Sequence, residues 1–413
     1  MYNSFIALLA ISALFTLINA KLLKLPATIG LMILGILLSI VFILLKQFMP
    51  SIYENIPHLI DNIDFHDFLM DIVLSFLLFA GAVHISIKEL NKQRLSVFVF
   101  AIIGTLISTI VVGYLSYFAF NLVGIEIELL YCLLFGALIS PTDPIAVISI
   151  FKNYKVKSSL TMKIEGESLF NDGIGIVIFI TIFSMINSDG SDIDLVNVGT
   201  LFLREAVGGI VFGLLIGWLS ILVLDKIITS PKFAVMTTLV VATLGYALAN
   251  TLELSGALAM VSSGLLIGNW LHKKSNEQIH RDVSLFWEII DDVLNSMLFV
   301  LMGVSILLID VDEINIMAAI FAIVIVLFSR FLSVSLPYSF IRISTGKLQK
   351  NDLKDVAILT WSGLRGGLAF ALALSIGNIA NGHFIIFITY SVAVFSIIVQ
   401  GLSIGKLVKK LYP

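Results

Sequence analysis

The chain has 413 residues, of which 59% are hydrophobic and 13% are charged, and its mean hydropathy is +1.05. Soluble domains carry about 25% charged residues, so this composition excludes an ordinary soluble protein. It predicts an all-α, polytopic membrane protein, because helices satisfy their own backbone hydrogen bonds in lipid. A formal net charge of −3 gives no indication of a nucleic-acid partner. Cys132 is the only cysteine, which excludes an intrachain disulfide.

Thirteen apolar segments are long enough to cross a bilayer as helices, which takes about 20 residues. The first follows Met1 without the basic segment of a signal peptide, so we expect it to remain as a span. In chain order the predicted spans cover residues 3–20, 26–46, 69–87, 95–120, 128–151, 163–187, 197–225, 233–250, 254–271, 285–309, 314–341, 354–376 and 383–405.

The lysine and arginine residues are distributed unevenly between the loops. Most of them lie in loops that follow odd-numbered spans, whereas loops after even-numbered spans collect acidic residues. Basic residues are retained on the cytoplasmic side of short loops. The pattern therefore predicts a multi-pass protein of the plasma membrane with its N-terminus outside and its C-terminus in the cytoplasm.

Two motifs place helix-breaking residues inside apolar segments. The fifth span contains Ser140-Pro141-Thr142-Asp143-Pro144, and the twelfth contains Ser362-Gly363-Leu364-Arg365-Gly366. Proline lacks a backbone donor, and glycine makes a helix easy to unwind. We therefore expect two broken helices that cross each other. Because the motifs are seven spans apart, the two halves of the chain would have inverted topology, as in many secondary transporters.

The predicted organisation is a single membrane domain over residues 1–413. The first inverted repeat covers 1–190 with spans one to six, span seven in 191–230 is a linker, and the second repeat covers 231–413 with spans eight to thirteen. We expect the functional core around spans five, six, twelve and thirteen.

Asp143 and Arg365 occupy corresponding positions in the two broken spans and carry opposite charges. Half-helix ends are positive at N-termini and negative at C-termini, and such side chains neutralise them. Asp143 is therefore a candidate for a structural role as much as for cation binding. Arg330 is the other cation within a predicted span, and the acidic residues of spans five and six outnumber the two arginines.

Span six carries a set of polar side chains within its apolar stretch, where ionisable residues indicate function by default. Ser168 and Asp172 share one helical face, and Glu167 and Asn171 share a face about 100° round the helix. Hard monovalent cations prefer carboxylate, hydroxyl and carbonyl oxygens. The candidate Na⁺ ligands are Asp172, Ser168 and Asp143, together with carbonyl oxygens near Thr142.

The same oxygens can bind a proton. Burial favours the neutral form of a carboxylate and a nearby cation favours the ionised form, so Na⁺ and H⁺ would compete for Asp172. Competition at one site that opens alternately to the two sides of a membrane is antiport. We therefore expect exchange of Na⁺ or Li⁺ for H⁺, with K⁺/H⁺ exchange as an open alternative because oxygen ligands bind all three cations.

Four motifs also carry a resemblance to a known family. They are the two segments Ser140-Pro141-Thr142-Asp143-Pro144 and Gly363-Leu364-Arg365-Gly366, the segment Gly166-Glu167-Ser168-Leu169-Phe170-Asn171-Asp172-Gly173, and Phe286-Trp287-Glu288 with Asp291-Asp292. Over nearly the whole chain they resemble the sodium/proton exchanger branch of the monovalent cation:proton antiporters, which includes bacterial NhaP-like proteins. The resemblance implies an NhaA-like fold of inverted six-helix repeats. It also implies a homodimer in the bacterial inner membrane that serves pH homeostasis without a cofactor.

The resemblance assigns roles to individual residues. It implies that Asp172 binds the cation and the proton, that Asn171 is its neutral neighbour, and that Asp143, Thr142 and Ser168 are supporting ligands. Electrogenic relatives resemble this chain but carry two adjacent aspartates where it has Asn171-Asp172. A single titrating carboxylate therefore implies electroneutral exchange, with one cation for one proton.

Glu167 resembles a structural acid of the family that pairs with an arginine. Arg330 is the favoured partner and Arg365 is left to stabilise the broken twelfth span, although the reverse pairing stays open. Two aspartates on neighbouring spans also suit an intramembrane aspartyl protease, a remote alternative that lacks the expected Gly-x-Gly-Asp motif. The six histidines are scattered without metal-ligand spacing, so no transition-metal site is predicted.

Overall fold

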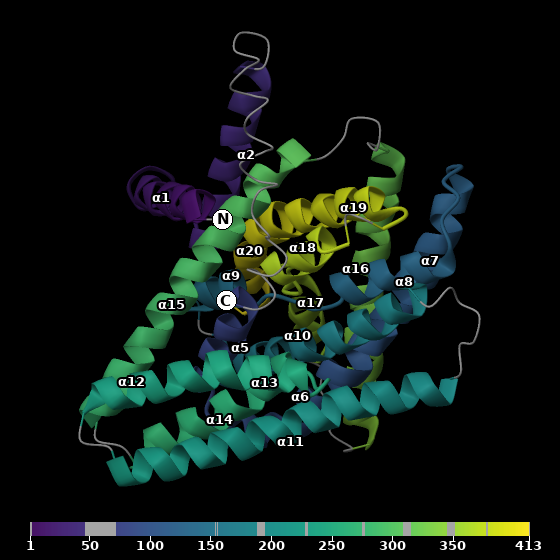
Figure 1. The fold of residues 1–413 in the computed structure, drawn as a ribbon. Coiled ribbons are helices and arrows are strands. Elements are labelled where there is room, and N and C mark those ends of the chain that lie inside the picture. Colours follow the sequence, from purple (N-terminus) through teal and green to yellow (C-terminus); the bar gives the residue numbers. More distant parts are fainter. Residues whose placement is uncertain are drawn as a thin grey trace. The chain divides into compact units, whose positions relative to one another are not determined.

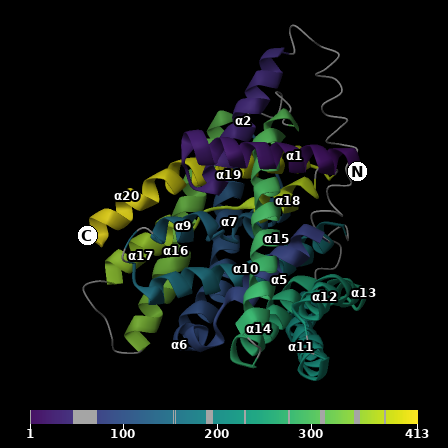
Figure 2. The ribbon, with the colours of Figure 1, turned by 90° about the vertical axis from the view of Figure 1, so that its left-hand side faces the viewer.

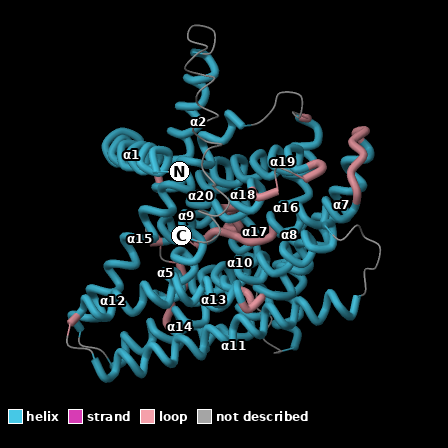
Figure 3. The backbone as a smooth tube through the Cα atoms, viewed as in Figure 1, coloured by secondary structure: helices cyan, strands magenta, loops and turns pink. Residues whose placement is uncertain are grey.

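The computed structural model describes residues 2–45, 72–152, 154, 156–187, 195–227, 230–274, 277–308, 315–344, 352–376 and 379–412. These residues are helical apart from short connections, and they contain no strand (Figure 3). The predicted all-α class is confirmed. The start of the third predicted span, the boundary at residue 190 and many acidic residues used for orientation, including Asp61, Asp189 and Asp310, lie outside the described residues.

Two compact units make up the chain. Unit 1 comprises Met1–Phe68, Leu106–Thr161 and Val293–Pro413, and unit 2 comprises Leu69–Thr105 and Met162–Asp292. The two units are defined by which segments pack together, whereas the predicted repeats are defined by symmetry between spans. The units therefore do not test the repeats. The inverted repeat stays a prediction.

Unit 1 contains both ends of the chain and both broken helices (Figure 1). Its elements are α1 (Tyr2–Ile18), the π-helical η1 (Asn19–Leu23), α2 (Ala27–Leu45), nearly all of α7 (Thr105–Leu122), α8 (Leu129–Ile139), α9 (Ile145–Phe151), the end of α15 (Glu277–Val304), the 3-10 turn η5 (Ser305–Leu308), α16 (Ile316–Ser344), α17 (Asp352–Trp361), α18 (Gly367–Leu374), α19 (Gly382–Phe395), the π-helical η7 (Ser396–Gln400) and α20 (Gly401–Leu411). A tight crossing joins α2 to the end of α15. A Cβ atom on Gly35 would lie 2.9 Å from Cα of Gly303, and the Ser39 hydroxyl donates to the carbonyl of Val304 at 3.2 Å.

Unit 2 contains α5 (Leu74–His84), α6 (Ile87–Phe98), the π-helical η3 (Val99–Gly104), most of α10 (Ser158–Asn187), α11 (Leu195–Ile227), α12 (Pro231–Val240), the π-helical η4 (Val241–Gly245), α13 (Tyr246–Thr251), α14 (Gly256–Lys274) and most of α15. Helices α11 and α14 lie side by side, and both views show them together (Figures 1 and 2). Glycines of α11 permit this approach, since a Cβ atom on Gly209 would lie 2.6 Å from the carbonyl oxygen of Ser255. On its other side α14 packs against α5, where a Cβ atom on Gly264 would lie 2.9 Å from the carbonyl oxygen of Phe79.

Each of the thirteen predicted spans coincides with a helical segment, but not every segment has the length and hydropathy of a membrane span. Nine helical segments of the described residues meet both criteria. The other four predicted spans are the two broken ones, the 11-residue α5 and the more polar α14. The two interruptions lie where the proline and glycine motifs predict them, which confirms the broken helices.

Trp287 is the largest fully buried side chain of unit 2, and it holds the middle of α15 in place. Its indole Nε1 donates to the hydroxyl of Thr238 at 3.0 Å. The ring centroids of Phe76 and Phe79 lie 5.7 and 4.7 Å away, within the range of favourable aromatic pairs. The side chain therefore connects α15 to α5 and α12.

We expect Trp287→Ala to destabilise the protein by about 3–5 kcal/mol, because it empties a buried aromatic site. Trp218→Ala is the matched control, since Trp218 lies on α11 with 53% of its surface exposed. Thermal unfolding of the detergent-solubilised proteins checks the prediction. Equal melting temperatures for the two variants would contradict it.

Candidate functional site

The two broken helices of unit 1 meet at their interruptions. The backbone N–H of Asp143, between α8 and α9, donates to the carbonyl of Leu364, between α17 and α18, at 2.8 Å. The two residues form an isolated antiparallel bridge. The crossing predicted from the sequence is thus a direct backbone contact between the unwound segments.

Arg365 reaches from the second break to the first. Its Nη1 donates to the carbonyl oxygens of Ser140 at 2.6 Å and Pro141 at 3.1 Å, and its backbone N–H donates to the hydroxyl of Ser396 at 3.0 Å. Those two carbonyls follow α8, whose C-terminal end carries partial negative charge. Arg365 is 1% exposed, so its guanidinium stabilises that helix end without competition from water. Arg365 is predicted from the sequence to stabilise the broken twelfth span, whereas these hydrogen bonds stabilise the break in the fifth.

Arg330 holds the end of the other interrupted helix. This residue of α16 is 6% exposed, and its Nη2 donates to the carbonyl oxygen of Leu359, in the last turn of α17, at 3.1 Å. A Cβ atom on Gly363 would overlap its guanidinium. In each broken helix, a buried arginine therefore donates to carbonyl groups where the first half ends.

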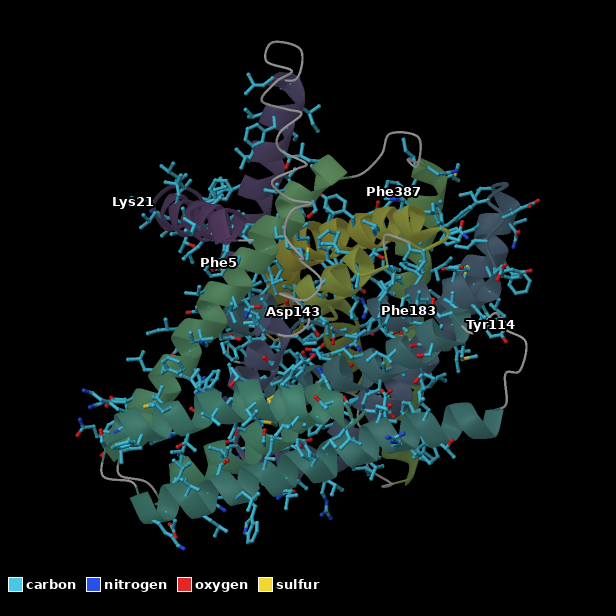
Figure 4. The ribbon with its side chains drawn as sticks, in the orientation of Figure 1. Phe5, Lys21, Tyr114, Asp143, Phe183 and Phe387 are labelled. Atoms are coloured by element: carbon cyan, nitrogen blue, oxygen red, sulfur yellow. The ribbon has the colours of Figure 1, made fainter. Side chains whose placement is uncertain are left out.

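Asp143, labelled in Figure 4, lies at the opposite kind of helix end. Its Oδ1 accepts a hydrogen bond from the backbone N–H of Ile145, the first residue of α9, at 2.8 Å. A helix N-terminus carries partial positive charge, so a carboxylate is stabilised there. Its neighbour Thr142 is buried, with 5% of its surface exposed.

Gly366 leaves the space that the Asp143 carboxylate occupies. A Cβ atom at Gly366 would overlap that carboxylate, although the backbone conformation of Gly366 is open to any residue. We expect Gly366→Ala to cost about 1–3 kcal/mol of stability by overpacking and to displace Asp143.

Gly405→Ala is the control for this change. The nearest side-chain atoms to its new Cβ atom, Cγ2 of Ile150 and Oη of Tyr154, would lie 3.4 Å away, which is ordinary contact. The melting temperature should therefore fall for Gly366→Ala alone. An unchanged melting temperature in Gly366→Ala, or an equal fall in Gly405→Ala, would refute the close approach of the Asp143 carboxylate to Gly366.

In unit 2, one face of α10 contacts α5, α6 and α14, and the buried polar side chains lie on the rest of its circumference. Gly166 packs against Val97 of α6, and Leu169 lies against Gly81 of α5. A Cβ atom on Gly173 would lie 2.6 Å from Cδ2 of Leu258 on α14. Helical periodicity puts Gly166, Leu169 and Gly173 on one face.

The candidate site residues of α10 are Glu167, Ser168, Asn171 and Asp172, and helical spacing places them away from that packed face. Glu167, Ser168 and Asn171 are 3%, 4% and 1% exposed, and Asp172 is half-buried. Polar side chains that are buried within an apolar helix indicate a functional site rather than a solvated surface. Four carboxylate, hydroxyl and amide groups within two turns supply oxygen ligands for a hard cation.

The predicted site residues are thus divided between the two units. Unit 1 holds Thr142, Asp143, Arg330 and Arg365 around its crossing helices, and unit 2 holds Glu167, Ser168, Asn171 and Asp172 on α10. Sequence reasoning missed Ser396 and the Leu359 carbonyl. A serine in an apolar run gives no signal, and every residue has a carbonyl group. Among the described residues, no three His, Cys, Asp or Glu side chains are grouped to hold a metal ion.

Comparison with known proteins identifies the family. Residues 9–410 match the model of the transmembrane sodium/hydrogen exchanger family. The chain belongs to this family. Its members are transporters rather than enzymes, so the aspartyl protease alternative is not supported.

Similar proteins extend over almost the whole chain. The Na⁺/H⁺ antiporter NhaP of Pseudomonas aeruginosa is 39% identical over 408 residues, covering 98% of this chain and 96% of that protein. The Na⁺/H⁺ antiporter NhaH of Halobacillus aidingensis is 33% identical over 409 residues, with 98% and 96% covered. The solved structure of the sodium proton antiporter MjNhaP1 from Methanocaldococcus jannaschii at pH 8 matches 98% of this chain and 97% of its own at a TM-score of 0.78. Since that match is 22% identical, it shows the fold alone.

Proposed function

We propose that this protein is a Na⁺/H⁺ antiporter of a cellular membrane. The observation that carries the proposal is the family match over residues 9–410. Relatives that cover the chain are named Na⁺/H⁺ antiporters, which favours Na⁺ over the K⁺ alternative. Crossing broken helices, with charged side chains at their ends, suit a transporter that binds ions near the middle of the bilayer.

Asp172 is the residue that we propose for binding both ions. It lies on α10 beside the neutral Asn171 and one turn from Ser168, so its carboxylate has supporting oxygen atoms on the same helix. An ionised Asp172 attracts Na⁺, and a protonated Asp172 does not. Raising the pH on one side of the membrane therefore favours release of the proton from Asp172 and binding of Na⁺ on that side.

One carboxylate that binds either a proton or a monovalent cation moves the same charge in both directions. We therefore propose electroneutral exchange, with Li⁺ as an alternative substrate because its charge and ligand preference match those of Na⁺. Cation binding by Asp143 and Thr142, and the ion pair between Glu167 and Arg330, remain predictions from the sequence. The same holds for the homodimer, for the inner-membrane location with the C-terminus in the cytoplasm, and for a role in pH homeostasis.

Reconstituted transport tests the proposed function. Proteoliposomes with an internal pH dye and an external potential-sensitive dye receive Na⁺, Li⁺, K⁺ or choline at equal ionic strength. We expect Na⁺ and Li⁺ to move protons without generating a membrane potential, and K⁺ to behave like choline. Proton movement with K⁺ alone would overturn the proposed substrate, a potential change with Na⁺ would overturn electroneutrality, and the absence of any proton movement would overturn antiport.

A further inference from the structure

Two imidazole rings face each other in unit 2. His272 lies near the C-terminal end of α14, and His280 lies in the first turns of α15. Nδ1 of His272 and Nε2 of His280 are 3.3 Å apart. The ring centroids are 5.1 Å apart, with an interplanar angle of 70°. Spacing along the sequence does not reveal this pair, because the rings come together through the packing of α14 and α15.

We propose that His272 and His280 form a binding site for a divalent transition-metal ion such as Zn²⁺, with water completing the coordination. Imidazole nitrogens bind Zn²⁺ at about 2.0–2.1 Å, so two of them on a tetrahedral ion lie about 3.3–3.4 Å apart. The two ring nitrogens already have that separation. The ion would replace the hydrogen between the two nitrogens, and each ring would turn so that its lone pair points at the ion.

Ser284 supports the orientation that the ion requires. Its hydroxyl lies 3.5 Å from Nδ1 of His280, one helical turn further along α15. A metal-ligating histidine usually donates from its second ring nitrogen to a neighbouring acceptor, which fixes the ring and its tautomer. With Nδ1 of His280 donating to Ser284, the lone pair of Nε2 points toward His272. His272 is exposed and His280 is half-buried, so the pair is accessible from water.

The local charges are mixed. Lys273 and Arg281 flank the pair, and Glu277 and Asp282 in the first turns of α15 offset them. Nε of Arg281 lies 3.9 Å from Oδ1 of Asp282. Imidazole ligands select Zn²⁺, Cu²⁺ and Ni²⁺ over Na⁺, Mg²⁺ and Ca²⁺, which prefer oxygen. This site is therefore chemically distinct from the transport site, and it stands whether or not the proposed function is correct.

Metal titration of the 413-residue chain tests the site. The protein is purified without a polyhistidine tag and titrated with Zn²⁺ by calorimetry. We expect one ion to bind per chain, and His272→Gln or His280→Gln to weaken binding by about tenfold or more. Ser284→Ala should weaken binding without abolishing it. His383→Gln is the matched control, because His383 is an exposed histidine of α19 and should leave Zn²⁺ binding unchanged.

A measurement on the unmodified protein keeps the test independent of the variants. Electron paramagnetic resonance with Cu²⁺ at one equivalent reports the number of coordinated nitrogens, and we expect two. A spectrum without nitrogen coupling, or Zn²⁺ binding that is equal in wild type and both histidine variants, would overturn the proposal. Such a result would leave the two rings as an ordinary hydrogen-bonded pair.

Discussion

Asp172→Asn is expected to abolish Na⁺-driven proton movement while the protein still folds. Asparagine has nearly the same shape as aspartate, but it neither carries the negative charge that attracts Na⁺ nor releases a proton near neutral pH. Asp172 is half-buried on the polar side of α10, and its packed face is formed by Gly166, Leu169 and Gly173, which the substitution leaves untouched. Proton flux in proteoliposomes is the measurement.

Asp225→Asn is the matched control for this substitution. Asp225 is an exposed residue near the end of α11, so the same chemical change should leave exchange at the wild-type rate. Melting temperatures of both variants report on folding. Exchange that persists in Asp172→Asn would remove Asp172 from the mechanism, and a misfolded variant would give Asp172 a structural role instead.

Arg365→Met is expected to have the largest effect on stability among changes to the crossing helices. The substitution removes the hydrogen bonds to the carbonyls of Ser140 and Pro141 and leaves both acceptors in a buried environment. Hydrogen bonds from charged donors contribute about 1.5–3 kcal/mol each, so we expect a loss of at least about 3 kcal/mol. The melting temperature should fall by about 5 °C.

One further variant at this position separates charge from hydrogen-bond geometry, and a second variant elsewhere is the control. Arg365→Lys keeps the charge but lacks the planar fork that contacts two carbonyls, so we expect an intermediate loss of stability. Arg94→Met removes an exposed arginine of α6 and should change the melting temperature very little. A melting temperature of Arg365→Met equal to that of wild type would show that the two contacts do not stabilise the break.

Local chemistry made the broken helices predictable. Pro141 and Pro144 remove backbone donors in the fifth span, and Gly363 and Gly366 weaken the twelfth, so the interruptions follow from the sequence directly. The hydrogen-bond partners of the charged side chains could not be predicted from the sequence. Whether Arg365 contacts its own helix or the crossing one depends on tertiary packing, which places the carbonyls of Ser140 and Pro141 within its reach.

Helix boundaries were less predictable than the breaks, for a physical reason. Hydropathy marks the segment that lipid favours, while helical hydrogen bonding continues into polar sequence. Helix α10 therefore begins at Ser158 rather than at 163, α15 begins at Glu277 rather than at 285, and the helix of the fourth span begins at Ile87 rather than at 95. The contact between His272 and His280 also arises from tertiary packing, so residue spacing could not reveal it.

Proton release on Na⁺ binding tests most directly whether Na⁺ and H⁺ compete for Asp172. The detergent-solubilised protein in weakly buffered solution with a pH dye receives Na⁺, and bound Na⁺ is measured in the same samples. We expect about one proton to be released per Na⁺ bound in wild type, and neither binding nor release in Asp172→Asn. Na⁺ binding without proton release, or equal release from the variant, would contradict it.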